Sequence, residues 1–184
     1  MKTTPTLFAA AVLLLAAFPS QARNINSPDH KFAIKADSTI ELVDSSGQTI
    51  LVLSKNTVGA KRVEIAWSPD SSKVAMAEDF ARGSAIFAAW FDGVAWHKTL
   101  QSDSDQAGIV SLAQGQLGGR LVSEERTFGG WISSDALQVK GSMAFSSGKR
   151  VPYEYVLEFG SGPGRLDRGG YEEGVIRGVR YQLL

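Results

Sequence analysis

The chain offers few side chains for acid-base or metal chemistry. It contains two histidines, His30 and His97, and no cysteine. Neither histidine has a second histidine or a glutamate at the local spacing that zinc sites use, and thiol chemistry requires a cysteine. The sequence therefore predicts no metal site, no cofactor and no catalytic residue set of these types.

Two short motifs imitate functional ones. Residues 146–149 (Ser-Ser-Gly-Lys) match the Ser-x-x-Lys pattern of a nucleophile with its lysine base, but that pair needs a helix and this run is typical of a turn. Residues 103–108 begin like a calcium loop, yet the twelfth position would be Gln114 rather than a bidentate glutamate. A helix cap explains the acidic residues better, and we expect a short helix over residues 107–114.

Carboxylates and aromatic rings remain as candidates. A hydrolase or lyase acting on glycan or peptide would use carboxylates that face a cleft, and four are available: Asp79, Asp92, Glu124 and Glu125. Three large rings crowd the Asp92-Gly93 dipeptide, which is typical of a hairpin turn. Because aromatic side chains are frequent interface anchors, we name these three as binding candidates, with core packing as the alternative: Trp90, Phe91 and Trp96.

The N-terminal stretch has the pattern of a signal peptide. Lys2 precedes an apolar run over residues 7–18, which is too short to span a membrane comfortably, and Ser20 and Ala22 suit the −3 and −1 positions of a cleavage site. We expect residues 1–22 to be removed, which leaves 162 of the 184 residues as one exported domain, periplasmic or secreted. The mature form is not expected to span a membrane.

The charge is balanced, with 19 basic and 19 acidic residues. Nucleic-acid binding needs clustered Lys and Arg to neutralise phosphates. Nucleic acid is therefore not an expected partner.

Two segments of the chain resemble each other. Residues 27–33 (Ser-Pro-Asp-His-Lys-Phe-Ala) recur as residues 68–75 (Ser-Pro-Asp-Ser-Ser-Lys-Val-Ala), at an offset of 41 residues with one residue inserted. A weaker third copy covers residues 131–139. Six residues are assigned as structural repeat positions: Pro28, Asp29, Trp67, Pro69, Asp70 and Trp131.

Each copy is expected to form a strand, a tight turn and a second strand. Residues 63–67 alternate apolar and other side chains with the period of a half-buried strand, and the proline and aspartate that follow favour a turn. Residues 153–159 form the cleanest amphipathic strand. The sequence predicts an all-β fold of antiparallel propeller-blade-like sheets or a twisted β-sandwich, with at most one short helix after the signal peptide. The expected units cover about 24–66, 67–106 and 120–184.

Residues 67–73 (Trp-Ser-Pro-Asp-Ser-Ser-Lys) resemble the WD-like repeats of TolB-type β-propellers, in which Trp-Ser-Pro-Asp-Gly-Lys marks the turn between the first two strands of a blade. Here Ser71-Ser72 replaces the single glycine, and no tryptophan precedes the first copy. Propellers close with four to eight blades, so three units are too few. We favour a compact monomer over a fragment completed by another copy, and self-association stays open.

The resemblance implies an exported, non-enzymatic module that binds protein or cell-envelope material. The carboxylate-based hydrolase or lyase is an alternative from another class. A third alternative is a propeller remnant with a structural role in an assembly.

Overall fold

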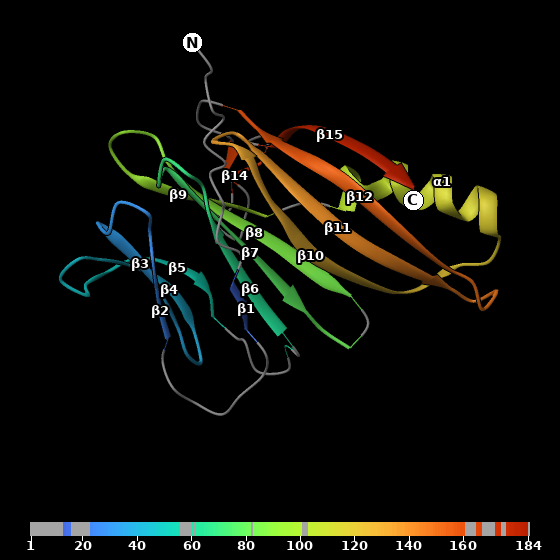
Figure 1. The fold of residues 1–184 in the computed structure, drawn as a ribbon, viewed down its shortest axis with the longest axis horizontal. Helices are drawn as coiled ribbons and strands as arrows, with labels where there is room; N and C mark the ends of the chain where they lie inside the picture. The colour runs from blue at the N-terminus through green and yellow to red at the C-terminus, as the bar shows by residue number, and fades with distance from the viewer. Residues whose placement is uncertain are drawn as a thin grey trace, which may run out of the picture.

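The computed structural model describes residues 13–15, 23–55, 60, 62–81, 83–100, 103–160, 165–166, 172–173 and 176–183. These residues form antiparallel sheets and one α-helix, which confirms the expected all-β class. Three meanders follow one another along the chain, coloured blue, green and orange to red in Figure 1, and the green one lies between the other two. None of the three closes into a ring.

The strands of each sheet pair in chain order. The first sheet holds β2 (Arg23–Asn26), β3 (Phe32–Ala36), β4 (Ile40–Asp44) and β5 (Thr49–Ser54). The second sheet holds β6 (Arg62–Trp67), β7 (Lys73–Asp79), β8 (Ser84–Phe91) and β9 (Trp96–Leu100), with β1 (Leu13–Leu15) on the outer edge of β6. The third sheet holds β10 (Leu121–Ser133), β11 (Ala136–Phe145), β12 (Arg150–Phe159) and β15 (Ile176–Leu183). A separate pair is formed by β13 (Arg165–Leu166) and β14 (Glu172–Glu173).

Two features differ from the expected division of the chain. Residues 62–66 belong with the second sheet rather than the expected first unit, because β6 pairs with β7 across the Ser-Pro-Asp turn. β1 lies inside residues 1–22 and pairs with residues 63–65.

The expected helix is present and longer than residues 107–114. It is α1 (Asp103–Leu117), and it ends where the N–H of Gly118 donates to the carbonyl of Gln114 at 2.9 Å. Gly118 has φ of 69°, the left-handed conformation that favours glycine after a helix. Ile109 and Ala113 join the core of the third sheet, and α1 lies beside β12 and β15 in Figure 1.

The second sheet is buried on both faces. Successive side chains of β6 point to opposite faces, and each face packs against a neighbouring sheet. Ile65 and Trp67 pack against the first sheet in one hydrophobic cluster, while Ala66 packs against the third sheet in another. The face toward the third sheet carries small residues opposite large rings. The small residues are Ala66, Ala75, Ala77 and Ala88, and the rings include Trp131, Tyr153 and Tyr155.

The faces at the two ends of the stack are polar. On the first sheet the outer face carries Lys35, which is exposed, and Glu41, which is half-buried. On the third sheet the outer face carries the exposed residues Glu125, Lys140 and Arg150. Polar outer faces end a stack of repeating units, and these charged residues suit the two ends of such a stack.

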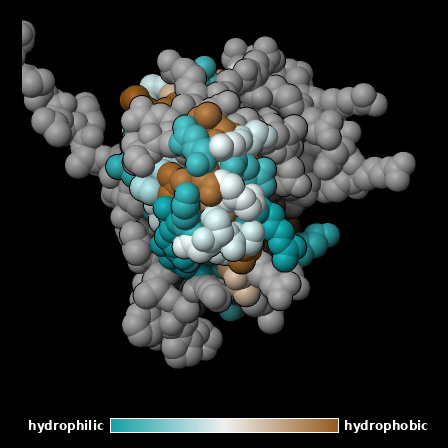
Figure 2. Space-filling model, turned by 90° about the vertical axis from the view of Figure 1, so that its right-hand side faces the viewer, coloured by the Kyte–Doolittle hydropathy of each residue, from teal (hydrophilic) through white to brown (hydrophobic). Residues whose placement is uncertain are grey.

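Figure 2 shows the end of the molecule that lies on the right in Figure 1. The coloured residues there are mostly hydrophilic or neutral, and the hydrophobic areas are small and separate. In the described part of the chain, no helix is both long enough and apolar enough to cross a membrane.

Candidate functional site

The turns between β2 and β3 and between β6 and β7 have the same hydrogen bonds. The hydroxyl of Ser27 donates to Asp29 Oδ1 at 2.7 Å, and that of Ser68 donates to Asp70 Oδ1 at 2.6 Å. Each serine hydroxyl also accepts the backbone N–H that starts the next strand, at 3.1 and 2.9 Å. The two copies are therefore structurally equivalent turns.

The equivalence extends to the backbone. His30 and Ser71, at the same turn position, have φ of 59° and 62°. Phe32 and Lys73 follow two residues later and accept from the first serine N–H of their turns at 2.9 and 2.8 Å. The copies thus align at an offset of 41 residues without the inserted residue that the sequence comparison used.

The repeat tryptophans connect consecutive sheets. Trp67 Nε1 donates to the carbonyl of Ile25 on β2, and Trp131 Nε1 donates to the carbonyl of Ala66 on β6, both at 3.1 Å. Ile25 and Ala66 each stand two residues before the first serine of their turn, so the same contact recurs one sheet later. The third copy falls on the turn between β10 and β11, where Asp135 N–H donates to Ser133 Oγ at 3.2 Å.

The turn aspartates are held in their ionised form. Burial opposes ionisation of Asp29 and Asp70, but hydrogen bonds from Ser27 and Ser68 and from the backbone outweigh it. The pKa of each carboxyl therefore lies below its ordinary value.

The turns of all three sheets gather at one end of the stack. The N–H of Asp29 donates to Ser71 Oγ at 3.0 Å, and Lys73 Nζ contacts Asp135 Oδ1 at 2.7 Å, so each turn contacts the next. In a meander every second turn lies at the same end. We call this surface the turn end and define it by turns 27–31, 45–48, 68–72, 92–95 and 134–135.

The three candidate rings divide between core and surface. Trp90 is 4% exposed and Trp96 9% exposed, whereas Phe91 is 36% exposed. Phe91 and Trp96 join Phe32 of the first sheet, with ring centroids 6.3 and 5.1 Å from the Phe32 ring. At the hairpin tip Val94 is 89% exposed. The apolar surface that the hairpin offers at the turn end is therefore Phe91 with Val94, above buried tryptophans.

The same hairpin holds a carboxylate and a histidine together. Asp92 accepts the N–H groups of Val94 and Ala95 at 2.7 and 2.8 Å, and Asp92 Oδ2 lies 2.9 Å from His97 Nε2. Backbone hydrogen bonds from Ala95 and Val94, with a smaller contribution from His97, lower the pKa of Asp92 to about 2. The ring of His97 stacks on that of Trp90 at 4.6 Å.

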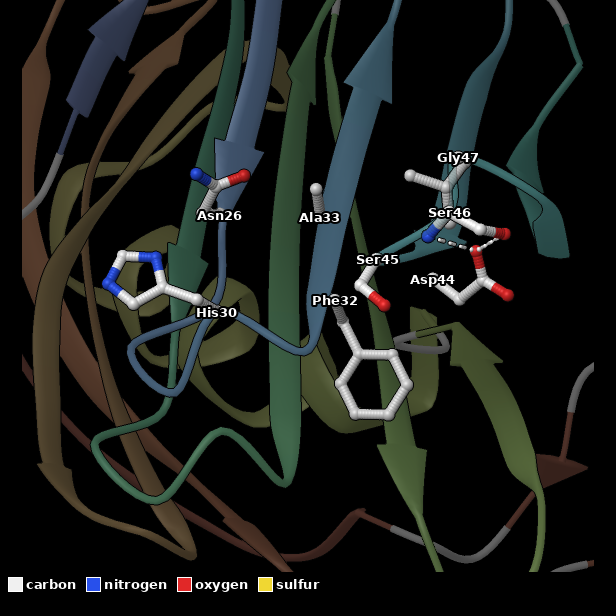
Figure 3. Close-up of a pocket in the computed structure, with 9 residues that line it drawn as sticks. Asn26, His30, Phe32, Ala33, Asp44, Ser45, Ser46 and Gly47 are labelled. Atoms are coloured by element: carbon white, nitrogen blue, oxygen red, sulfur yellow. Dashed lines mark hydrogen bonds between the residues drawn. The ribbon is translucent and has the colours of Figure 1, made fainter.

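A pocket of about 430 Å³ lies at the turn end of the first sheet. Its floor is Ala33 and Val43, and Figure 3 shows Asn26 and His30 on one side of Ala33 and Ser45 and the two residues after it on the other. The Ser45 side is rigid, because Asp44 Oδ1 accepts both the N–H and the hydroxyl of Ser46, at 2.8 and 2.6 Å. The pocket thus combines an apolar floor with amide, imidazole and hydroxyl groups on its rim.

Sequence reasoning missed this pocket. Its residues come from the ends of β2, β3 and β4 and from turns 27–31 and 45–48, which meet because β2 and β4 end at the same side of the meander. The sequence signal for it would have been Asn26 at the end of β2 together with Ser45 and Ser46 directly after β4.

Comparisons with protein-family models, curated proteins and solved structures found no match. Among the described residues no group of three or more His, Cys, Asp or Glu side chains is placed to hold a metal ion.

Two of the four candidate carboxylates meet in a buried ionic network between the second and third sheets. Arg62 forms an ion pair with Asp79 and also donates to the backbone carbonyl of Arg126 at 2.7 Å. Arg126 contacts Glu124 at 2.7 Å, and Glu124 also accepts a short hydrogen bond from the hydroxyl of Tyr153.

The surroundings raise the pKa values of two groups in this network, Arg126 and Tyr153. Burial lowers the pKa of Arg126, but the facing Tyr155 and Glu124 outweigh it and the pKa is raised overall. Burial and the neighbouring Glu124 raise the pKa of Tyr153 far above its ordinary value. These four residues all lie on β10 and β12, so their contacts are within the third sheet, whereas Arg62 of the second sheet contacts the backbone of Arg126.

The other two carboxylates lie elsewhere. Asp92 is in the β8–β9 hairpin, and Glu125 points to the outer face of the third sheet, 3.7 Å from Arg150. The four candidates therefore occupy three separate places, and the structure does not bring them together as one set.

Proposed function

We propose that this chain is an exported binding module that recognises protein or cell-envelope material through its turn end. The observation that carries the proposal is the combination found there. One surface holds a pocket of about 430 Å³, an adjacent hairpin with Phe91 and Val94 exposed, and turns that hydrogen-bond to one another. Rigid turns with exposed apolar and polar groups are the usual makeup of a recognition surface.

The TolB-type relationship of the repeats is part of this proposal. Two turns share the serine–aspartate hydrogen bond and the bond from the next strand's N–H to the serine hydroxyl, and Trp67 and Trp131 make the same hydrogen bond to the preceding sheet. These regularities support blade-like units of common origin. With polar outer faces at both ends, the units form an open stack of three rather than a closed ring.

Export is also proposed, on the pattern of residues 1–22. It predicts a mature protein that begins at Arg23, and mass spectrometry of protein purified from the export compartment of a bacterial host tests it.

The binding proposal is tested by NMR titration of the exported protein with two probes, a peptidoglycan digest and a library of short peptides. We expect shift changes confined to the turn end with one of the two probes. Val94→Asp should abolish them, because it charges the hairpin tip without altering the core. Val122→Asp is the matched control, since Val122 is 52% exposed near the start of β10, far from the β10–β11 turn.

Shift changes on the outer face of the third sheet, or equal effects of the two valine substitutions, would contradict the proposal. His30→Gly tests the pocket separately, because glycine adopts the φ of 59° without strain. It should weaken binding without lowering stability if the pocket takes part.

A further inference from the structure

β6 pairs with β7 on one side, and its other edge is paired with a segment from the N-terminal stretch. β1 pairs antiparallel with it, with Leu13 opposite Ile65, Leu14 opposite Glu64 and Leu15 opposite Val63. β6 is itself buried, since Glu64 and Ile65 are each 1% exposed. The site is thus a slot between the first and third sheets that accepts an extended backbone.

The pairing of β6 with β7 shows which backbone groups face this slot. Ser68 N–H donates to the carbonyl of Lys73 at the end of the hairpin, at 2.8 Å. Hydrogen-bonded pairs alternate along an antiparallel ladder, so Glu64 and Ala66 bond toward β7. The N–H and C=O groups of Val63 and Ile65 therefore point into the slot.

The side-chain preference of the slot also alternates. Positions opposite Ile65 and Val63 share their face with the apolar cluster of the first two sheets. The position opposite Glu64 shares the other face. There Glu64 Oε2 accepts the N–H of Phe128 at 3.1 Å, and Glu64 Oε1 has no hydrogen-bond partner among the residues that the structure describes. A buried acceptor without a donor is costly, so a residue that can donate a hydrogen bond is favoured at this position.

We propose that the edge of β6 is a docking site for an extended segment of a partner protein, with an apolar residue, a hydrogen-bond donor and an apolar residue opposite Ile65, Glu64 and Val63. The proposal rests on the proposed export, because removal of residues 1–22 takes β1 away and opens the slot. Before removal β1 occupies the site in place of the partner. Addition of a strand to a free sheet edge is an established mode of peptide recognition.

The burial of Glu64 agrees with this picture. Burial raises the pKa of its carboxyl, against the hydrogen bond from Phe128 and the charge of Arg62, while the charge of Asp79 adds to the rise. A donor placed beside Oε1 would supply the partner that the carboxyl lacks.

The test uses protein expressed from the full chain and purified after export, and soluble tagged peptides that copy residues 11–18. Two peptides carry Leu14→Thr and Leu14→Val, which are isosteric and differ in the hydroxyl. We expect the Thr peptide to bind at least about fivefold more tightly in fluorescence anisotropy, because a hydrogen bond to an otherwise unsatisfied buried acceptor is worth that much.

Backbone pairing is tested with two N-methylated forms of the Thr peptide. Methylation at position 15, opposite Val63, should abolish binding, whereas methylation at position 14 should leave it within about twofold, because that N–H points away from β6. Equal binding of the Thr and Val peptides, or equal effects of the two methylations, would overturn the docking site.

The same preparation separates the two proposals. A protein that begins at Arg23 but binds none of the peptides overturns the docking site and leaves export standing. A protein that still begins at Met1 overturns both. Concentration-dependent dimerisation on a sizing column that the Thr peptide reverses would assign the edge to a second copy of this chain and overturn the partner segment.

Discussion

Replacement of Arg126 by methionine should destabilise the protein far more than the same substitution at Arg150. The Arg126 side chain is 4% exposed and pairs with Glu124, which is 7% exposed, at 2.7 Å. Arg150 lies on the outer face of the same sheet, 55% exposed, and pairs with Glu125 at 3.7 Å. The two ion pairs therefore differ mainly in burial.

The expected loss in the free energy of unfolding depends on which charged group each substitution leaves without its partner. Arg126→Met leaves the Glu124 carboxylate between two sheets with only the Tyr153 hydroxyl as a partner. Breaking a buried ion pair from one side costs about 3–5 kcal/mol. Arg150→Met removes an exposed pair, which is worth about 0–1 kcal/mol.

The assay is urea unfolding followed by tryptophan fluorescence and circular dichroism, with coincident transitions required for two-state analysis. A domain of this size has about 5–15 kcal/mol of stability, so Arg126→Met should remain measurable or be recognisably unfolded. The double variant Glu124→Gln with Arg126→Met should recover roughly 1–3 kcal/mol relative to Arg126→Met, because no unpaired charge is left.

A loss below about 1 kcal/mol for Arg126→Met, equal to that of Arg150→Met, would refute this reasoning. It would mean that water reaches Glu124 and that the Arg126–Glu124 pair contributes no more to stability than an exposed pair. Failure of the double variant to recover stability would show that lost packing, rather than charge, causes the effect.

Three further predictions test other parts of the fold. Glu78→Gln should stabilise the protein at pH 7 but not at pH 4. Burial raises the folded-state pKa of Glu78 above its ordinary value, so the stability that the protonated carboxyl contributes is lost as pH rises through that pKa. Urea unfolding at both pH values measures this, and a variant that is less stable than the parent at pH 7 would contradict it. Gly141→Ala should lower the free energy of unfolding by about 1–3 kcal/mol, because its Cβ would lie 2.5 Å from the Tyr153 hydroxyl. Gly115→Ala in α1 has open space around the new Cβ and should raise the free energy of unfolding by up to about 1 kcal/mol. Thermal unfolding compares the two variants. Trp67→Phe and Trp131→Phe should lower stability by similar amounts, about 1–3 kcal/mol each, since each leaves a carbonyl of the preceding sheet without its indole donor; a large difference between them would argue against equivalent repeats.

Much of the fold could be predicted from local patterns. The alternation of residues 63–67, the turn chemistry of Pro69 and Asp70, and the apolar face of residues 153–159 each predict an element that the structure contains. Tyr153 and Tyr155 are both buried on the predicted face. These predictions succeed because strand period and turn geometry depend on residues that are neighbours in sequence.

The sequence could not place the sheets against one another. Asp79 and Glu124 were predicted only as candidate acid-base carboxylates. Together with Glu64 and Arg126 they are buried because two sheets pack face to face there. Trp90 and Trp96 were candidates for an exposed surface and lie in the core, because the hairpin packs its ring-bearing faces against both neighbouring sheets.

The sequence alone determined the all-β class, the repeat at an offset of 41 residues and the turn geometry, because each depends on contacts a few residues apart. The tertiary structure decided which strand edges are free, which charges are buried and where a pocket forms. The pocket at Ala33 forms where three consecutive strands and their turns come together, and the slot beside Glu64 depends on the long-range pairing of β1 with β6.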